Sequence, residues 1–295
     1  MYEPTHFMPP EGRHRTSGGQ MSEFPRCPWH PSVPPSPTKW IGMLLACAML
    51  DSGAAVAQTS LGSSREIVFP VVAATASFTS HVTLFNPNGG DITVGLFYFD
   101  ADNLPSPGAK PCTDAVVPAH RSVQFDLAAK CTLGAGSHFG LLIAADSAGT
   151  NAFFGYSRTD NTAGAGFSVE GFPLANFSSN TSNATGLTRV AAAPTFQTNC
   201  FVESLAGPIN YDLALFDGTT GAQIGTTLRG TLGPFAQFRY LDVFAAAGAA
   251  PGDHTNVRAQ FTRTSAETLD LIGFCTVQDN TNFGADFRIA KSSTP

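Results

Sequence analysis

Charged side chains are scarce in this chain of 295 residues. Asp, Glu, Lys and Arg together make up 13% of it, and the formal net charge is −6. No window gathers lysines and arginines among aromatic residues, the pattern by which a protein neutralises and stacks on a nucleic acid. Long amphipathic helical periodicity is also missing. The sequence therefore argues against a nucleic-acid-binding protein and against a helical bundle.

The motifs that mark metal and catalytic sites are missing as well. There is no CxxC, HExxH or HxH spacing for a metal, and no GxSxG nucleophile elbow followed by a helix. Ser157 is the nearest to such an elbow, but its counterpart in the repeat described below is Cys275, which suits a disulfide better. The histidines beyond residue 57 are scattered among different expected strands and loops: His81, His120, His138 and His254. We expect no catalytic residue, no metal and no cofactor.

Three residue types that shape β-proteins are abundant. Phe occurs 24 times, Gly 29 times and Pro 21 times. Phe beside many Thr, Val and Ile favours strands, whereas Gly and Pro supply frequent turns. This combination predicts an all-β protein.

The first 57 residues are typical of a polar extension followed by a secretory signal peptide. The apolar run Trp40–Leu50 precedes a small-x-small pattern that ends at Ala57 and marks a cleavage site. Asp51 ends the run well short of the ~20 residues that a membrane span needs. Cys47 stands in a lipoprotein-like box, so a lipid anchor at this residue is an alternative. We expect a secreted, periplasmic or cell-surface protein with no stable membrane span in the mature chain.

Two later stretches, 63–177 and 187–292, repeat one another at a shift of about 116 to 119 residues. Matched residues keep their order: Phe78 with Phe196, Leu96 with Leu213, Phe99-Asp100 with Phe216-Asp217, Pro118 with Pro234, Asp126 with Asp242 and Gly155 with Gly273. Residues 178–186, rich in Ser, Asn and Thr, lack an apolar period and are predicted to be a linker. We therefore predict two tandem domains, 63–177 and 187–292.

Each predicted domain contains short alternating runs separated by turn residues. In the run 92–99, for example, Ile92, Val94 and Leu96 should face one side of a strand. About seven such runs in each domain match an immunoglobulin-like antiparallel β-sandwich. A jelly roll or a small barrel stays open as an alternative, because the pattern does not order the strands.

Four cysteines follow the predicted signal peptide: Cys112, Cys131, Cys200 and Cys275. Four cysteines allow three pairings. The pairing Cys112–Cys131 and Cys200–Cys275 keeps each disulfide within one domain, and we prefer it. We expect Cys200–Cys275 to join two sheets, as the immunoglobulin disulfide does. Disulfides agree with export to an oxidising compartment.

The tripeptide Asp-Asn-Thr occurs in both predicted domains, at 160–162 and 279–281. Asp and Asn side chains accept hydrogen bonds from nearby backbone amides and tolerate left-handed conformations, so they are frequent in turns after strands. We interpret Asp160 and Asp279 as turn residues. A ligand-binding loop shared by both domains is the alternative.

Short motifs resemble those of bacterial secreted proteins built from tandem β-sandwich repeats. Such repeats contain an FP, then F.T and L.N, then a late GY followed by DN and G. The matching residues are Phe69-Pro70, Phe78-Thr79, Leu84, Asn86-Pro87, Gly155-Tyr156 and Asp160-Asn161. The second domain departs from the pattern by carrying Ser204-Leu205 in place of Asn86-Pro87. The resemblance implies secreted β-sandwich modules and no catalytic role.

Three functions stay open from the sequence. The first is a secreted or cell-surface structural or adhesion protein that acts by contact with a protein or a matrix. The second is a module that binds a glycan or small ligand through exposed aromatic residues, with Phe97, Tyr98, Phe235, Phe238 and Tyr240 as candidates. The third is a hydrolase of unrecognised type, for which Asp160 and Asp279 would be tested. The expected partner is an extracellular protein or glycan, and no nucleic acid.

Overall fold

The structure is a computed structural model that describes residues 63–100, 109–177, 180–192, 195–205, 207–266 and 271–292. These residues form an all-β arrangement of antiparallel sheets, as the composition predicts. No helix in this part of the chain is long and apolar enough to cross a membrane. The predicted signal peptide lies outside the described residues.

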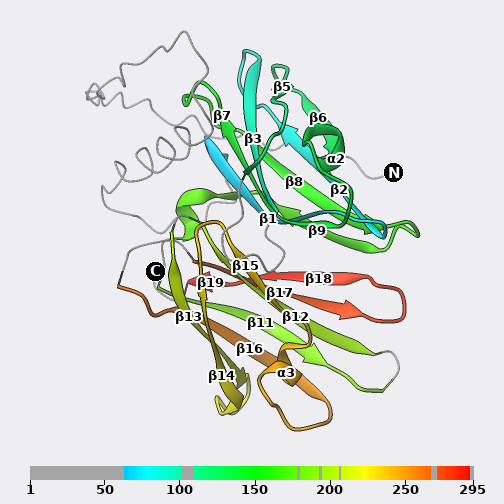
Figure 1. Ribbon diagram of the computed structural model, residues 1–295, viewed down its shortest axis with the longest axis vertical. Coiled ribbons are helices and arrows are strands. Elements are labelled where there is room, and N and C mark those ends of the chain that lie inside the picture. Colours follow the sequence, from blue (N-terminus) through cyan, green and yellow to red (C-terminus); the bar gives the residue numbers. More distant parts are fainter. Residues whose placement is uncertain are drawn as a thin grey trace, which may run out of the picture.

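The N-terminal half of the described chain contains strands β1 to β10 and two short helical segments (Figure 1). The strands are β1 (Glu66–Ala74), β2 (Phe78–Phe85), β3 (Ile92–Asp100), β4 (Ala109–Lys110), β5 (Ala115–Val117), β6 (Ser122–Asp126), β7 (His138–Asp146), β8 (Phe154–Asn161), β9 (Gly166–Glu170) and β10 (Phe172–Pro173). The helical segments are α2 (Leu127–Lys130) and the 3-10 turn η1 (Leu174–Phe177).

The C-terminal half contains strands β11 to β19 and one helix, and lies below the N-terminal half in Figure 1. The strands are β11 (Thr181–Arg189), β12 (Phe196–Ser204), β13 (Ile209–Asp217), β14 (Gln223–Leu232), β15 (Gln237–Tyr240), β16 (His254–Arg263), β17 (Leu271–Asp279), β18 (Ala285–Ile289) and β19 (Lys291–Ser292). The helix is α3 (Val243–Ala246).

Both halves use the same order of strands. In the C-terminal half, one sheet has the order β14-β13-β16-β11-β19 and the other the order β15-β12-β17-β18. In the N-terminal half, the corresponding orders are β4-β3-β7-β1, with β5 beside β3 and β10 beside β1, and β6-β2-β8-β9. One residue pair, Ala74 with Thr79, connects these two N-terminal sets of strands. The repeat in the sequence is therefore also a repeat in the order of elements.

This strand order differs from that of an immunoglobulin domain in the pairing of its first and last strands. In the immunoglobulin order, the first strand pairs with the second and the sixth with the seventh. In the C-terminal half, the first strand β11 pairs with the sixth, β16, and the second strand β12 pairs with the seventh, β17. The alternation of a strand shows which side chains face a core but not which strands are neighbours, so the sequence pattern left the strand order open.

The predicted linker 178–186 is mostly strand. β11 begins at Thr181 and pairs with β16, where Ser182 lies opposite Phe261 and Ala184 opposite Ala259. The buried residues at its start are small or polar, so this segment lacks the apolar alternation by which a strand is recognised. The predicted boundary at residue 187 is therefore placed too late.

Each half has a hydrophobic core between its two sets of strands. In the C-terminal half, Val202 on β12 and Leu213 on β13 belong to one buried cluster. In the N-terminal half, Val82 on β2 and Leu96 on β3 belong to another. Because each cluster takes residues from both sets of strands, the two sheets of each half lie face to face.

Two disulfides join Cys112 to Cys131 and Cys200 to Cys275, the pairing preferred from the sequence. Cys200 and Cys275 lie directly opposite each other on β12 and β17. The expectation that this bridge joins two sheets is therefore wrong, because it links neighbouring strands of one sheet. Inward-pointing positions exist on both sheets, so strand alternation cannot distinguish the two cases.

A third buried cluster joins the two halves at what we call the interface. Leu141, on the outer face of β7, belongs to the same cluster as Phe201 and Phe274, on the outer face of β12 and β17. Phe99 of β3 stacks on Phe235, with ring centroids 4.2 Å apart. Such stacked and buried rings add to the apolar area removed from water. The two halves are therefore packed against each other and not merely connected.

A glutamate is buried in the interface. Glu203 on β12 is 0% exposed and accepts a hydrogen bond from the side-chain amide of Gln237, which also reaches the carbonyl oxygen of Pro70 at 3.4 Å. The Oε2 atom of Glu203 has no hydrogen-bond partner among the described residues. Burial raises the pKa of Glu203 well above its usual range, and the hydrogen bond from Gln237 opposes this only in part.

We predict that removing the Cys200–Cys275 disulfide destabilises the protein more than removing Cys112–Cys131. The cysteines are 75 residues apart in the first and 19 in the second. The loss of chain entropy on closing such loops corresponds to about 4 and about 3 kcal/mol. Urea unfolding of the two double Cys→Ala variants measures both losses. Equal or reversed losses in unfolding free energy would contradict the prediction.

We predict that Glu203→Gln makes the protein more stable at neutral pH. Because the folded state binds the proton of Glu203 more tightly than the unfolded state, this residue favours folding most below the ordinary glutamate pKa of 4.5, and the advantage is lost as the pH rises. The glutamine variant has no such loss. Urea unfolding between about pH 4 and about pH 8 should show a gain that widens with pH. A gain that is the same at every pH would disprove the assignment.

Candidate functional site

Two outer sheet faces that correspond in the repeat have different surroundings. In the C-terminal half, the outer face of β15-β12-β17-β18 is covered at the interface. In the N-terminal half, the outer face of β6-β2-β8-β9 exposes Phe154 by 44% and Tyr156 by 46%. We call this second surface the free face.

The strand registers identify matching positions on the two faces. The cross-strand pairs Thr83–Tyr156 and Phe85–Phe154 of the free face correspond to Phe201–Phe274 and Glu203–Ile272 of the covered face. Phe274 and Ile272 are buried, whereas Tyr156 and Phe154 are exposed. The free face therefore presents aromatic rings at the positions through which the C-terminal half contacts a neighbouring sheet.

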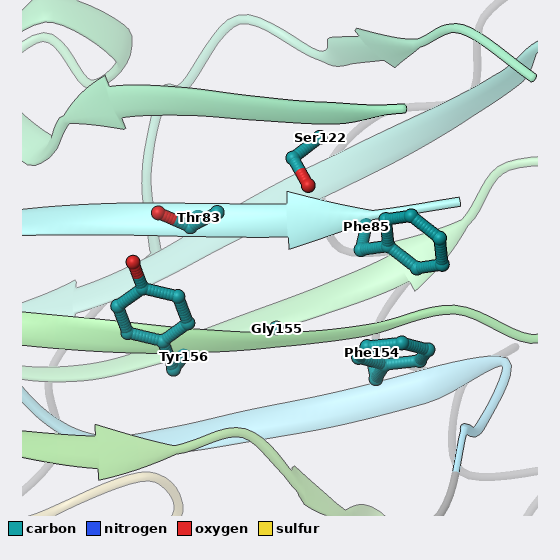
Figure 2. A pocket seen from close by; sticks show the side chains of 6 residues that line it. All are labelled: Thr83, Phe85, Ser122, Phe154, Gly155 and Tyr156. Atoms are coloured by element: carbon teal, nitrogen blue, oxygen red, sulfur yellow. The ribbon is translucent and has the colours of Figure 1, made fainter. Parts of the chain in front are cut away.

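The aromatic residues of the free face line a shallow hollow of about 250 Å³ (Figure 2). The rings of Phe85 and Phe154 are 4.8 Å apart and tilted by 41°. Tyr156 lies beside Thr83, and Ser122 of β6 approaches from the other side of β2. Ring carbons dominate the lining, with hydroxyl groups at its margin, so the hollow suits an apolar group that carries polar substituents.

A polar cluster adjoins the aromatic hollow on the same face. His81 on β2 contacts Asp126 on β6 through Nδ1 at 2.6 Å and Asp160 on β8 through Nε2 at 3.6 Å. Arg158 pairs with Asp160 at 3.1 Å and donates to the carbonyl oxygen of Gly164 at 2.9 Å. These side chains are partly exposed, so the cluster offers solvent-accessible charge more than folding energy.

The two Asp-Asn-Thr tripeptides have different roles. Asp160 lies within β8 and points into the polar cluster, while Asn161 accepts hydrogen bonds from the backbone amides of Ala163 and Ala165. The turn interpretation is therefore wrong for Asp160. It holds for Asp279, whose Oδ1 accepts from both the hydroxyl and the backbone amide of Thr281. The identical tripeptides concealed this difference, because strand β8 ends at Asn161 whereas strand β17 already ends at Asp279.

The glycine that precedes each tripeptide is a packing requirement. A Cβ atom on Gly155 would lie 2.3 Å from the backbone oxygen of Thr83, and one on Gly273 would lie 2.3 Å from the ring of Phe261. Both approaches are closer than atoms tolerate. The repeated glycine therefore reflects close packing inside each half.

The predicted aromatic ligand residues differ in their exposure to solvent. Phe235 is 9% exposed and stacks on Phe99 at the interface, and Tyr98 is fully buried in the core of the N-terminal half. Tyr240 is half-buried and shares a hydrogen bond of 2.9 Å with the hydroxyl of Tyr211. Of the candidates on β15, Phe238 is the more exposed, at 38%. Tertiary packing thus covers Phe235, whereas Tyr240 keeps part of its surface exposed.

The structure does not bring together the residues that the sequence offered for catalysis, Ser157, Asp160 and Asp279. Ser157 is 1% exposed and lies opposite Val82 inside the N-terminal half, so its hydroxyl is not presented to a substrate. No group of three or more His, Cys, Asp or Glu side chains in the described ranges is arranged to hold a metal ion. Asp160 and Asp279 lie at different sites, one in the polar cluster and one in a turn.

Comparisons with known proteins assign no function to the site. No protein-family model matches the chain, and neither a curated protein nor a solved structure matches it.

No residue of the aromatic hollow was predicted as a ligand residue, although strand alternation contains part of the signal. The alternation of β2 places Val82 and Leu84 in the core, which leaves Thr83 and Phe85 on the opposite side. The same reasoning places Phe201 of the second copy outward, yet that residue is buried at the interface. Only the packing of the two halves shows which outward aromatic residues meet solvent.

We predict that Asp279→Ala lowers the thermal midpoint, whereas Asp160→Ala changes it less. Hydrogen bonds from the hydroxyl and then the backbone amide of Thr281 lower the pKa of Asp279. A carboxylate with a lowered folded pKa stabilises the fold above the ordinary value of 3.8, and this stabilisation is lost as the pH falls through the folded pKa. Thermal melts between about pH 3 and about pH 7 test both variants. A larger effect of Asp160→Ala would reverse the roles assigned to the two aspartates.

Proposed function

We propose that this is a secreted or cell-surface protein without catalytic activity. It acts as a structural or adhesion component by contact with a protein or a matrix. The observation that carries the proposal is the free face. Its exposed rings, Phe154 and Tyr156, occupy the positions that the second copy uses to bind an apolar sheet. The free face is therefore the contact surface for a partner.

The chemistry of the free face supports a contact function. Aromatic anchors near the centre of a surface, with polar groups around them, are typical of binding hot spots. Phe154 and Tyr156 supply the anchors, and the cluster around His81 and Asp160 supplies the polar margin. Exposed apolar groups that lie together mark interaction sites, whereas single exposed apolar residues are common on any protein.

The disulfides support the cellular location in the proposal. Cys112–Cys131 and Cys200–Cys275 are formed, and disulfides persist mainly in secreted and periplasmic proteins. We propose that the two halves are tandem β-sandwich domains that follow a removed signal peptide. Mass spectrometry of the exported chain tests this directly, because it reports the N-terminal residue and the disulfide pairs together.

We predict that the free face cross-links to an extracellular protein. The experiment replaces Tyr156 with the photoreactive p-benzoylphenylalanine in the exported chain and irradiates intact producing cells. Leu241, which is 60% exposed and lies outside the free face, receives the same replacement as a control. Adducts are expected from position 156 and not from position 241.

The other outcomes are equally informative. Adducts at position 156 that consist of carbohydrate would assign the face to a glycan in place of a protein. Equal adducts from positions 156 and 241 would contradict the choice of face. A complete lack of adducts at 156, or a hydrolytic activity lost in Asp160→Ala, would refute the contact function itself.

A further inference from the structure

The contact between the two halves joins unlike surfaces. The N-terminal half contributes the outer face of β3-β7-β1, and the C-terminal half contributes the outer face of β15-β12-β17-β18. Because the halves repeat one strand order, each half has one face of each kind. One molecule therefore leaves two corresponding faces unused: the free face of the N-terminal half and the outer face of β14-β13-β16-β11 in the C-terminal half, which we call the end face.

The end face has exchanged apolar residues for polar ones. By register, the row Phe97–Ile143–Val68 in the N-terminal half corresponds to the row Ala214–Gln260–Asn183 in the C-terminal half. In the same way, Leu141 corresponds to Arg258. Arg258 stacks over the ring of Phe216, 4.4 Å from its centroid, and its guanidinium donates to Asn183 at 2.5 Å. The end face is thus polar enough to lie in water, and it carries the Arg258 cation near its centre.

The charges of the two unused faces are opposite. On the end face, the described charged residues are Arg229, Arg258 and Lys291 against Asp212. On the free face, they are Asp126, Asp160 and Glu170 against Arg158, with His81 between two of the acids. Each face thus carries three charges of one sign and one of the other, and the excess is basic on the end face and acidic on the free face.

We propose that a second copy of this chain occupies the free face by means of its end face. The contact repeats between molecules the pairing of faces that already joins the two halves within one molecule. The cation of Arg258 meets a face that carries an exposed tyrosine ring and an excess of acids, both of which attract a guanidinium group. This inference rests on the proposed contact function and names its partner.

The geometry of such a contact has a further consequence. An interface between two different patches of the same chain is heterologous, so it leaves an unused patch at each end of the pair and adds further copies. The product is a head-to-tail row of molecules. Because the end face is polar where the interface within the molecule is apolar, the contact between molecules is reversible and weakens with salt.

Two single variants test the proposal on the purified, exported chain. Tyr156→Arg places a cation on the free face, and Arg258→Glu places an anion on the end face. Leu241→Ser, at an exposed apolar residue outside both faces, is the matched control. Sedimentation velocity measures association, and circular dichroism confirms that each variant is folded.

The expected results separate a head-to-tail contact from any other. The unmodified chain and Leu241→Ser form a concentration-dependent series of oligomers at low salt that dissociates at high salt. Each of the other variants associates at least about tenfold more weakly, which corresponds to about 1.4 kcal/mol. Mixing Tyr156→Arg with Arg258→Glu restores association, because the end face of the first variant and the free face of the second are both intact, and the introduced arginine and glutamate carry opposite charges.

Three outcomes would overturn the inference. They are an unmodified chain that stays monomeric at every concentration, an Arg258→Glu variant that still forms dimers through two free faces, and a mixture of the variants that remains monomeric. These outcomes are distinct from failure of the contact function. A monomeric chain whose position 156 still cross-links to a different protein on cells would keep the contact function and remove only the second copy as partner.

Discussion

The structure depends on the packing of an outer sheet face of the N-terminal half against a different outer sheet face of the C-terminal half. Within each half, two sheets cover each other's inner faces, but this leaves two outer faces whose composition is free to vary. Between the halves, an outer face rich in Phe, Leu, Ile and Val is buried against the outer face around Phe201 and Phe274. Burial of this area is what makes the two copies one packed unit.

This constraint explains why two copies with one strand order differ so much at their surfaces. A position such as that of Phe274 is buried because the N-terminal half covers it, whereas its counterpart Tyr156 is exposed. Conversely, Leu141 lies in the interface, and its counterpart Arg258 is only partly buried. Each copy is therefore adapted to its place in the pair, with apolar residues where a neighbour is present and polar residues where water is.

Buried polar groups show the same adaptation. Glu203 lies in the interface beside Gln237, and its position corresponds to Phe85 in the other half, which lines the aromatic hollow. The aspartates of the repeated tripeptide have also diverged, one into an ion-paired cluster on the free face and the other into a turn. The free face combines these polar groups with exposed rings, which is why the proposed function is placed there.

Much of the local structure followed from the sequence alone. Strand-favouring composition predicted the all-β class, alternation predicted that Ile92, Val94 and Leu96 share one face of a strand, and the spacing of four cysteines favoured the pairing that is found. These properties depend on neighbours along the chain or on simple counting. The strand β11 escaped recognition because small and polar residues fill its start.

Tertiary structure decided which strands are neighbours and which outer face is covered. Phe235 and Phe154 are both phenylalanines near turns or strand ends, yet Phe235 is buried against Phe99 and Phe154 is open to solvent. The pleat of a strand places a side chain on one side or the other, but it contains no information on what lies beyond that side. That depends on contacts between segments far apart in the chain, and these contacts determine where the candidate site lies.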